Sequence, residues 1–162
     1  MKHHAADDRN KIALEEIESV LKDLNGDGND PKPLNSFLII VEGRRDVVSL
    51  RNLGINAEIV PCANRPAAEF CEEIAEKRKT AIILTDWDRK GGILAARLED
   101  QFKNLEVRVE TSQREKLLFY SKREIKDVES LYAHVVKLRE SVLKKFEKEE
   151  ESDSFLFESD LK

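Results

Sequence analysis

The sequence is poor in the residues on which disulfide-linked and zinc-binding domains depend. Its 162 residues include two cysteines, three histidines and one tryptophan. Cys62 and Cys71 do not form a C-x-x-C pair, and His3 and His4 lie in a polar leader. We therefore expect neither a disulfide framework nor a structural zinc site. His134 lies among leucines and valines at helical spacing, which indicates a packed or half-exposed helix residue rather than a catalytic base.

Long apolar runs are also lacking. No run approaches the roughly 20 residues that a membrane-spanning helix needs, and residues 1–10 have no apolar core of a signal peptide. We therefore expect a cytoplasmic protein with no membrane partner. Hydrophobic residues make up 40% of the chain and charged residues 38%, and the charged fraction is well above the roughly 25% of an average soluble protein. This composition predicts one compact domain with a heavily solvated surface.

An overall excess of positive charge is missing as well, since the formal net charge is −5. The charge is distributed unevenly, however. Residues 147–162 contain seven acidic and two basic residues, or −5, and residues 1–36 contain eight acidic and five basic residues, or −3. Residues 37–146 hold the remaining 21 basic and 18 acidic residues, or +3. The middle of the chain is therefore mildly basic, which permits binding of a polyanion without establishing it.

The pattern of apolar residues predicts strands that alternate with helices. Phe37–Val41 is an unbroken apolar run, which is typical of a strand buried on both faces. Further strands are predicted at residues 57–60, 81–85 and 107–109, and the segments between them carry apolar residues at helical spacing. This alternation is typical of βαβ units, in which helices cover both faces of a parallel sheet. The predicted fold class is α/β.

We divide the chain into three parts. Residues 1–36 comprise an amphipathic helix, over about residues 8–24, and a linker rich in Asn, Asp, Gly and Pro. Residues 37–146 form the α/β domain, whose last helices, around residues 117–120 and 125–146, close the domain or pair with the N-terminal helix. Residues 147–162 are acidic and poor in apolar residues, which predicts a disordered tail. Its apolar island, Phe155–Phe157, is a candidate contact for a protein partner or for the body of this protein.

Three acidic residues follow predicted strands. Glu42 comes directly after Phe37–Val41, and Asp86 and Asp88 come after the strand at residues 81–85. Ligands of parallel sheets bind outside the carboxyl ends of the strands, so we expect the three carboxylates in one crevice. Asp86 and Asp88 can face one ion there while Trp87 turns away. Carboxylate oxygens suit Mg²⁺, with Mn²⁺ as a substitute. The alternative is that these acids cap helices.

Basic residues and a glycine accompany both strand ends. Free backbone N–H groups at the start of a helix, and the close approach that glycine allows, suit a phosphate group. The alternative is that the charged residues are ordinary solvated helix residues. The candidates for phosphate contacts are Arg44, Arg45, Arg89, Lys90 and Gly91.

These acidic segments resemble the Toprim domain. Val41-Glu42-Gly43, followed by Asp46, is similar to its strand-end glutamate, and Asp86-Trp87-Asp88-Arg89-Lys90-Gly91 is similar to its D-x-D-x-x-G motif. The resemblance spans about residues 37–110, and Lys126–Leu131 is similar to the closing segment of small archaeal Toprim proteins. The resemblance implies a Rossmann-like fold in which Asp86 and Asp88 are metal ligands and Glu42 is a general acid/base or a further ligand.

The resemblance also implies a class of function. Toprim domains occur in topoisomerases, bacterial-type primases, nucleases and the recombination mediator RecR. For a chain of this size it implies Mg²⁺-dependent phosphodiester chemistry on RNA or DNA, as a small nuclease or a related phosphotransferase. The alternative is a non-catalytic nucleic-acid-binding or assembly module that keeps the metal site. A receiver-like regulatory domain shares the α/β pattern, but its phosphoacceptor Asp and switch Lys cannot be placed here.

Overall fold

The centre of the structure is a parallel β-sheet. The computed structural model describes the backbone of residues 2–160 and the side chains of residues 5–156. The strands are β1 (Phe37–Val41), β2 (Glu58–Pro61), β3 (Thr80–Ile83) and β4 (Val109–Glu110). They are hydrogen-bonded in the order β2-β1-β3-β4, and every neighbouring pair is parallel. The α/β fold class predicted from the sequence is confirmed.

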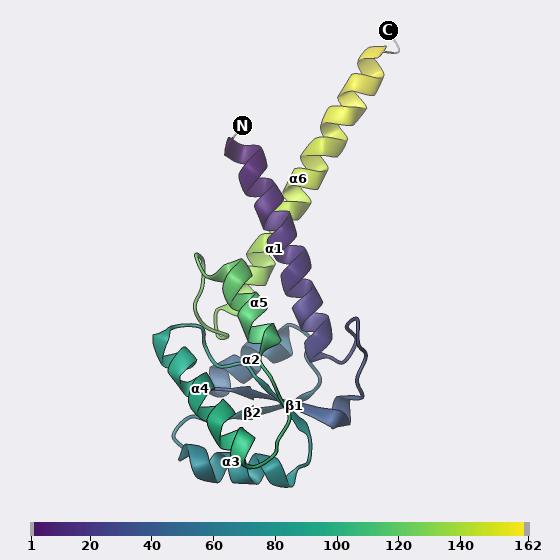
Figure 1. Cartoon of the computed structure of the whole chain (residues 1–162). Coiled ribbons are helices and arrows are strands. Elements are labelled where there is room, and N and C mark those ends of the chain that lie inside the picture. The colour runs from purple at the N-terminus through teal and green to yellow at the C-terminus, as the bar shows by residue number, and fades with distance from the viewer. Residues whose placement is uncertain (1, 161–162) are drawn as a thin grey trace.

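Helices cover both faces of this sheet (Figure 1). They are α1 (Lys2–Leu24), α2 (Arg44–Asn52), α3 (Ala67–Glu76), α4 (Arg89–Asn104), α5 (Ser112–Ser121) and α6 (Leu131–Asp160), with a short 3-10 helix, η1 (Leu34–Ser36), before β1. Helices α3 and α4 pack on one face, and α1, α2, α5 and α6 pack on the other. Three layers result, with the sheet in the middle.

Strand β1 lies inside the sheet because both of its faces are apolar. All five of its residues are buried, and successive side chains point to opposite faces of the sheet. Ile39 and Val41 belong to the core beneath α1, α2, α5 and α6, whereas Leu38 and Ile40 belong to the core beneath α3 and α4. A strand with a core on each side reads as an unbroken apolar run, as the sequence shows.

Helices α1 and α6 lie side by side although they are far apart in the sequence. Ile17 of α1 is fully buried in the core that α6 shares. Arg139 Nε donates to Glu18 Oε1 over 3.1 Å, and Lys145 Nζ donates to Asp8 Oδ1 over 3.0 Å. Helices α1 and α6 are thus in contact, which is one of the two arrangements that the sequence left open for the last helices. Among the described residues, no helix combines the length and the apolarity that crossing a membrane requires.

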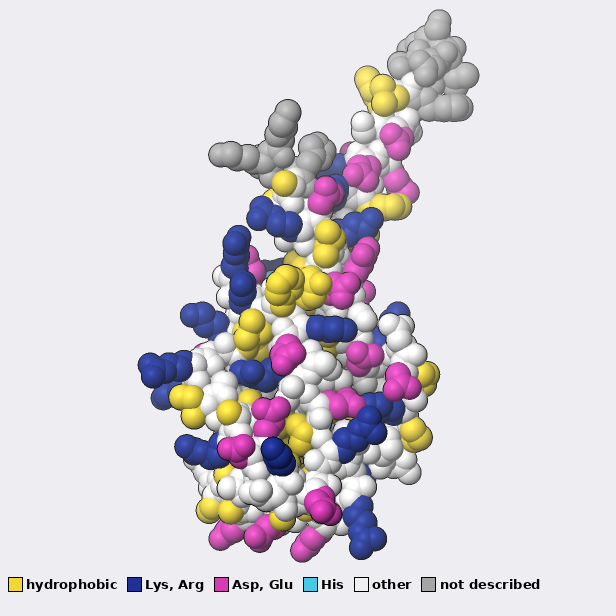
Figure 2. Space-filling model, viewed as in Figure 1, with side chains coloured by type: hydrophobic (Ala, Val, Ile, Leu, Met, Phe, Trp, Pro, Cys, Tyr) yellow, Lys and Arg dark blue, Asp and Glu magenta, His cyan; other side chains and the backbone are white. Residues whose placement is uncertain are grey.

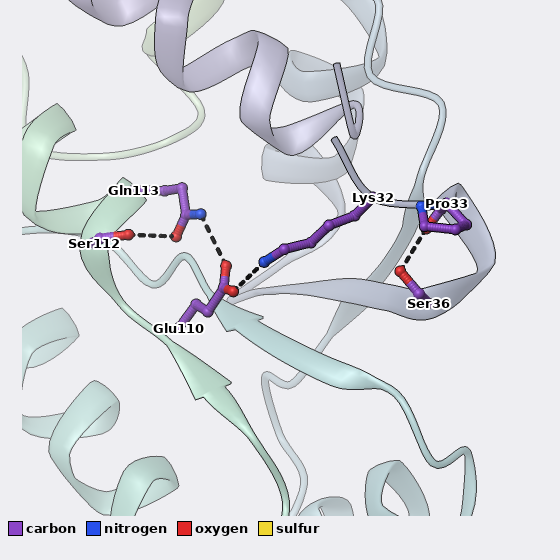
Figure 3. A network of polar contacts seen from close by, with 6 residues as sticks. All are labelled: Lys32, Pro33, Ser36, Glu110, Ser112 and Gln113. Carbon is purple, nitrogen blue, oxygen red and sulfur yellow. Dashed lines mark hydrogen bonds and ion pairs between the residues drawn. The ribbon is translucent and has the colours of Figure 1, made fainter. Parts of the chain in front are cut away.

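The linker between α1 and β1 is turned by a glycine and held by a polar network. Gly26 has a φ of 75°, a left-handed conformation that glycine adopts easily. Lys32 Nζ contacts Glu110 Oε1 at the end of β4, and Gln113 Nε2 donates to Glu110 Oε2 over 3.1 Å (Figure 3). Glu110 therefore connects the linker with β4 and with the start of α5.

Two segments differ from the prediction. Helix α6 begins at Leu131 rather than near Ile125, because residues 122–130 form an irregular connection. The same helix continues through Asp160, whereas composition predicted disorder over residues 147–162. Glu and Lys are good helix formers, and extending an existing helix avoids the cost of nucleation. Phe155 is 73% exposed there, and the side chain of Phe157 lies outside the described residues, so the partner contact stays a prediction.

Candidate metal centre

The carboxyl ends of β1 and β3 form the point of the sheet where a ligand is expected. The chain leaves β1 for β2 on one side, and after β2 it crosses to β3 on the other side of β1. Ligands of parallel α/β proteins bind where connections diverge in this way. Glu42 follows β1 directly, and Asp86 lies three residues beyond the end of β3. The topology thus places both carboxylates beside this switch point.

Glu42 and Asp86 are in contact in the crevice. Glu42 Oε1 accepts a hydrogen bond from the Asp86 backbone N–H over 3.3 Å, and Asp86 Oδ1 accepts one from the Val128 N–H over 3.0 Å. Burial, together with the nearby charges of Glu42 and Asp46, raises the pKa of Asp86 to about 7, although the hydrogen bond from Val128 opposes the shift. Carboxylates crowded in this way are stabilised by a proton or a cation.

Asp46 is a third acidic residue of the crevice. Its side chain is buried, and its Oδ2 accepts a hydrogen bond from the Gly43 N–H over 2.9 Å, which caps the start of α2. Burial raises the pKa of Asp46, while the N–H groups of Gly43 and Glu129 lower it. One surface pocket of about 340 Å³ is lined by Glu42, Gly43, Arg44, Arg45, Asp46, Ala63, Asp86 and Glu129.

The segment from Thr85 to Gly91 forms a compact turn at the start of α4. Asp88 is the N-cap of this helix, and its Oδ1 accepts a hydrogen bond from the Gly91 N–H over 2.7 Å. Thr85 Oγ1 donates to Gly91 O over 2.8 Å. A Cβ atom at position 91 would overlap the backbone carbonyl of Asp86, so a glycine is needed there. Gly91 therefore shapes the turn, and its N–H is already used by the cap.

Asp88 lies apart from the other two predicted ligands. Its side chain is exposed, it does not line the pocket of Glu42 and Asp86, and one of its oxygens serves the helix cap. Within residues 5–156, no group of three Asp, Glu, His or Cys side chains is arranged to hold a metal ion. Helix capping, the alternative considered from the sequence, accounts for one oxygen of Asp88.

The donor set nevertheless suits a hard cation. Mg²⁺ usually binds one or two protein carboxylates and completes its shell with waters and substrate phosphates. Glu42 and Asp86 form such a pair, and the raised pKa of Asp86 reflects burial and a repulsion that a cation would relieve. The chemistry of Glu42 and Asp86 therefore fits Mg²⁺. Asp88, two positions after Asp86 in the sequence, has one oxygen free of the helix cap.

Residues 122–130, here called the α5–α6 connection, close one side of the crevice. Trp87 N–H donates to Lys126 O over 2.9 Å, and Trp87 Nε1 donates to Ile125 O over 2.8 Å. Val128 N–H holds the carboxylate of Asp86. Trp87 itself is buried in the apolar core, so the prediction that it turns away to pack is confirmed.

Arg114 is a residue of the site that sequence reasoning missed. Its Nε donates to Thr85 O over 3.0 Å, and its Nη2 donates to Asp86 O over 2.7 Å. It lies on α5, 28 residues after Asp86, so no local spacing connects it with the motif. The guanidinium fixes the backbone beyond the end of β3 and thereby the position of Asp86.

The predicted phosphate contacts fall in two places. Arg44 and Arg45 line the pocket at the start of α2, and Arg45 Nη1 lies 3.4 Å from Glu129 Oε1. Arg89 and Lys90 are exposed in the first turn of α4. The structure therefore places two of the four basic side chains at the pocket itself and the other two at the exposed start of α4.

Fold and crevice together define a Toprim domain, and residues 37–114 match that family. The UPF0292 protein Mbar_A0484 of Methanosarcina barkeri is 43% identical over 126 residues, which cover 78% of this chain and 82% of that protein. A UPF0292 protein of Methanosarcina acetivorans is 40% identical over 137 residues, which cover 85% of this chain and 92% of that protein. The chain therefore belongs to the UPF0292 family of small archaeal Toprim proteins, and the resemblance seen in the sequence is confirmed.

A solved structure shows the same fold. A protein from Aquifex aeolicus aligns with a TM-score of 0.57, over 70% of this chain and 95% of that one, at 20% sequence identity. At this identity the likeness concerns the fold alone.

Proposed function

We propose that this protein binds Mg²⁺ through Glu42, Asp86 and Asp88 and carries out phosphodiester chemistry on nucleic acid, as a small nuclease or a related phosphotransferase. The observation that supports this best is the contact between Glu42 Oε1 and the Asp86 backbone at the switch point of the sheet. Mn²⁺ is expected to replace Mg²⁺. The match to the Toprim domain supports nucleic acid as the substrate class.

The side chains of the crevice have separate tasks in this proposal. The ion, when bound, supplies positive charge that offsets the charge of a phosphodiester in its transition state. Asp86 offers a carboxylate fixed by Val128 and Arg114. Glu42 is placed to hold the ion or to move a proton of the attacking or leaving oxygen. The exposed guanidinium of Arg44 would contact a substrate phosphate.

Turnover tests this proposal directly. Labelled structured RNA, single-stranded DNA and duplex DNA are incubated with the protein in Mg²⁺ or Mn²⁺, and products are resolved by size. We expect metal-dependent conversion of at least one substrate, and EDTA should abolish it. An absence of turnover on all three, with metal binding demonstrated by calorimetry, would count against catalysis.

A second candidate function is a nucleic-acid-binding or assembly module without catalysis. It is favoured by Asp88, one oxygen of which caps α4 rather than facing the pocket of Glu42 and Asp86. This candidate predicts salt-dependent nucleic-acid binding whose affinity does not change in Asp86→Ala. The nuclease hypothesis instead predicts that Asp86→Ala loses turnover.

A further inference from the structure

Exposed cations of the α5–α6 connection lie beside the candidate metal centre. They are Lys122, Arg123 and Lys126. The backbone O of Lys126 accepts the hydrogen bond from Trp87 N–H over 2.9 Å, and Val128 N–H donates to Asp86 Oδ1 over 3.0 Å. These bonds attach the connection, and with it the three cations, to the carboxyl end of the sheet.

These cations form no ion pair with the carboxylates of residues 5–156. The acidic residues of the same connection have other contacts. Glu129 pairs with Arg45, and Asp127 Oδ1 accepts a backbone hydrogen bond at the start of α6 over 2.8 Å. Burial lowers the pKa of His134, and the charge of Glu124 opposes this shift. The connection as a whole has three basic and three acidic residues and a formal charge of 3 − 3 = 0, so what it offers a ligand is three exposed cationic side chains outside ion pairs.

The opposite end of the sheet differs in part: two of its lysines are paired, whereas Arg78 and Lys103 form no ion pair among the described side chains. Lys77 and Lys79 precede β3, and both pair with Glu58, at 3.0 Å and 3.7 Å. At the carboxyl end, neither Arg89 nor Lys90 in the first turn of α4 forms an ion pair within the part of the chain that the structure describes. Figure 2 shows Lys and Arg side chains along the left side of the body, where Figure 1 places the start of α4 and the α5–α6 connection.

We propose that a nucleic acid bound at the candidate metal centre runs across the α5–α6 connection, where Lys122, Arg123 and Lys126 contact its phosphates. This inference rests on the proposed function, because the molecule that would cross the α5–α6 connection is the nucleic-acid substrate. Cations that neutralise phosphates release condensed counterions, so exposed cations without partners favour such binding most. Phosphate contacts carry no sequence information, so the connection positions the strand without selecting its sequence.

The test compares two triple variants of the full chain that lose the same charge. The first is K122Q/R123Q/K126Q. The matched control is K77Q/R78Q/K103Q, which also removes two lysines and one arginine, from exposed positions at the amino end of the sheet. In the control, Glu58 keeps its contact with Lys79. Thermal melting of both variants verifies that they fold.

Binding is measured by fluorescence anisotropy over a range of salt concentrations. The probe is a fluorescein-labelled single-stranded DNA with phosphorothioate linkages, which resist cleavage, in the presence of Mg²⁺. Each phosphate contact with a single strand contributes about 0.7 to the slope of log K against log salt, so the connection variant should lose about 2 from that slope. The control variant should retain the wild-type slope.

The outcomes separate this surface from the proposed function. An equal loss of slope in the two triple variants would show that only net charge affects binding. That result would overturn the proposed binding surface. An unchanged slope in K122Q/R123Q/K126Q would overturn it as well, and in both cases metal-dependent turnover by the wild type would still support the proposed function. A wild-type protein that neither binds nor converts nucleic acid would overturn both.

Discussion

Asp86 is held at three separate points. Its backbone N–H donates to Glu42, its backbone O accepts from Arg114, and its carboxylate accepts from Val128. A carboxylate that is fixed before a ligand arrives loses little conformational freedom on binding. The same surroundings therefore bury Asp86, which raises its pKa, and supply the hydrogen bonds that orient it.

Substitution of the acids distinguishes their roles. Asn keeps the shape of Asp but removes its charge, so Asp86→Asn and Asp88→Asn should each weaken Mg²⁺ binding. The loss should be larger for Asp86, because Asn still serves as an N-cap at position 88. Metal-free Asp86→Asn should also melt at a higher temperature than wild type, since less charge is confined in the crevice. Calorimetry measures the affinity, and the fluorescence of Trp87, the only tryptophan, gives a second signal.

Glu42→Gln should show a different pattern if Glu42 chiefly moves protons. Turnover should fall roughly 10²–10⁴-fold, the usual scale for a general acid/base, with Mg²⁺ affinity largely retained. Equal Mg²⁺ affinity in wild type, Asp86→Asn, Asp88→Asn and Glu42→Gln would contradict the assignment of these residues as metal ligands. Loss of binding in Glu42→Gln alone would make Glu42 the principal ligand.

Gly91 and Gly92 offer a matched pair of substitutions. A Cβ at position 91 would overlap the Asp86 carbonyl, whereas a Cβ at position 92 would meet Arg114 Nη2 at an ordinary 3.7 Å. Gly91→Ala should therefore lower the free energy of unfolding by about 1–3 kcal/mol. Gly92→Ala should be neutral or stabilise by up to about 1 kcal/mol, because alanine favours a helix over glycine. Urea denaturation compares them, and equal stabilities would contradict the close contact at position 91.

The residues of the site could be predicted from the sequence only where they follow a strand closely. Glu42 and Asp86 follow apolar strands, and the rule for parallel sheets places both at one edge. The pairing of Asp88 with Asp86 assumed an extended chain, whereas the chain turns into α4 there and uses Asp88 as a cap. Arg114 reaches Asp86 through the tertiary fold, and no pattern in the chain indicates such a contact.

At the scale of elements, the strands were easier to predict than the α5–α6 connection. Ile125, Val128 and Leu131 recur every three residues, which imitates the buried face of a helix. However, the backbone O of Ile125 and the backbone N–H of Val128 form hydrogen bonds with the site, so they are not available to a helix. Tertiary hydrogen bonds therefore override the local pattern.

The polar network around Glu110 predicts a dependence of stability on pH. Burial alone would raise the pKa of Glu110, but the contacts with Lys32 and Gln113 outweigh it and lower the pKa. The stabilisation is therefore present above the unfolded-state pKa of about 4.3 and is lost as the pH falls through the lower folded-state value. Lys32→Gln should lower the free energy of unfolding at neutral pH by about 1 kcal/mol or less.

The measurement is urea denaturation of wild type and Lys32→Gln between neutral and acid pH. The difference between the two proteins should disappear once Glu110 is protonated. Lys103→Gln is the control, because Lys103 is exposed and forms no ion pair among the described residues. A difference for Lys32→Gln that persisted unchanged in acid would exclude the charge of Glu110 as its cause.

At the scale of the whole molecule, α1 supplies part of the apolar core that covers one face of the sheet. Ile17 is fully buried in the core beneath α5 and α6, while Ile12 on the same helix is 52% exposed. Ile17→Ala should lower the free energy of unfolding by about 2–5 kcal/mol, the usual cost of removing a buried aliphatic side chain. Ile12→Ala should change it by about 0.5 kcal/mol at most. Similar losses in both variants, measured by urea denaturation, would contradict this packing of α1.

The contact of α1 with α6 also determines when the molecule can be completed during its synthesis. Asn10 and Ser141, which are in contact across the two helices, are separated by 131 positions along the chain. At about 5–20 residues per second, a ribosome needs roughly 7–26 seconds to make that stretch. The part of the apolar face of α1 that packs against α6 stays uncovered for this time, although α5 is made earlier. Glu42 and Asp86 emerge well before Val128, so the nascent chain carries both carboxylates before it can hold them in place.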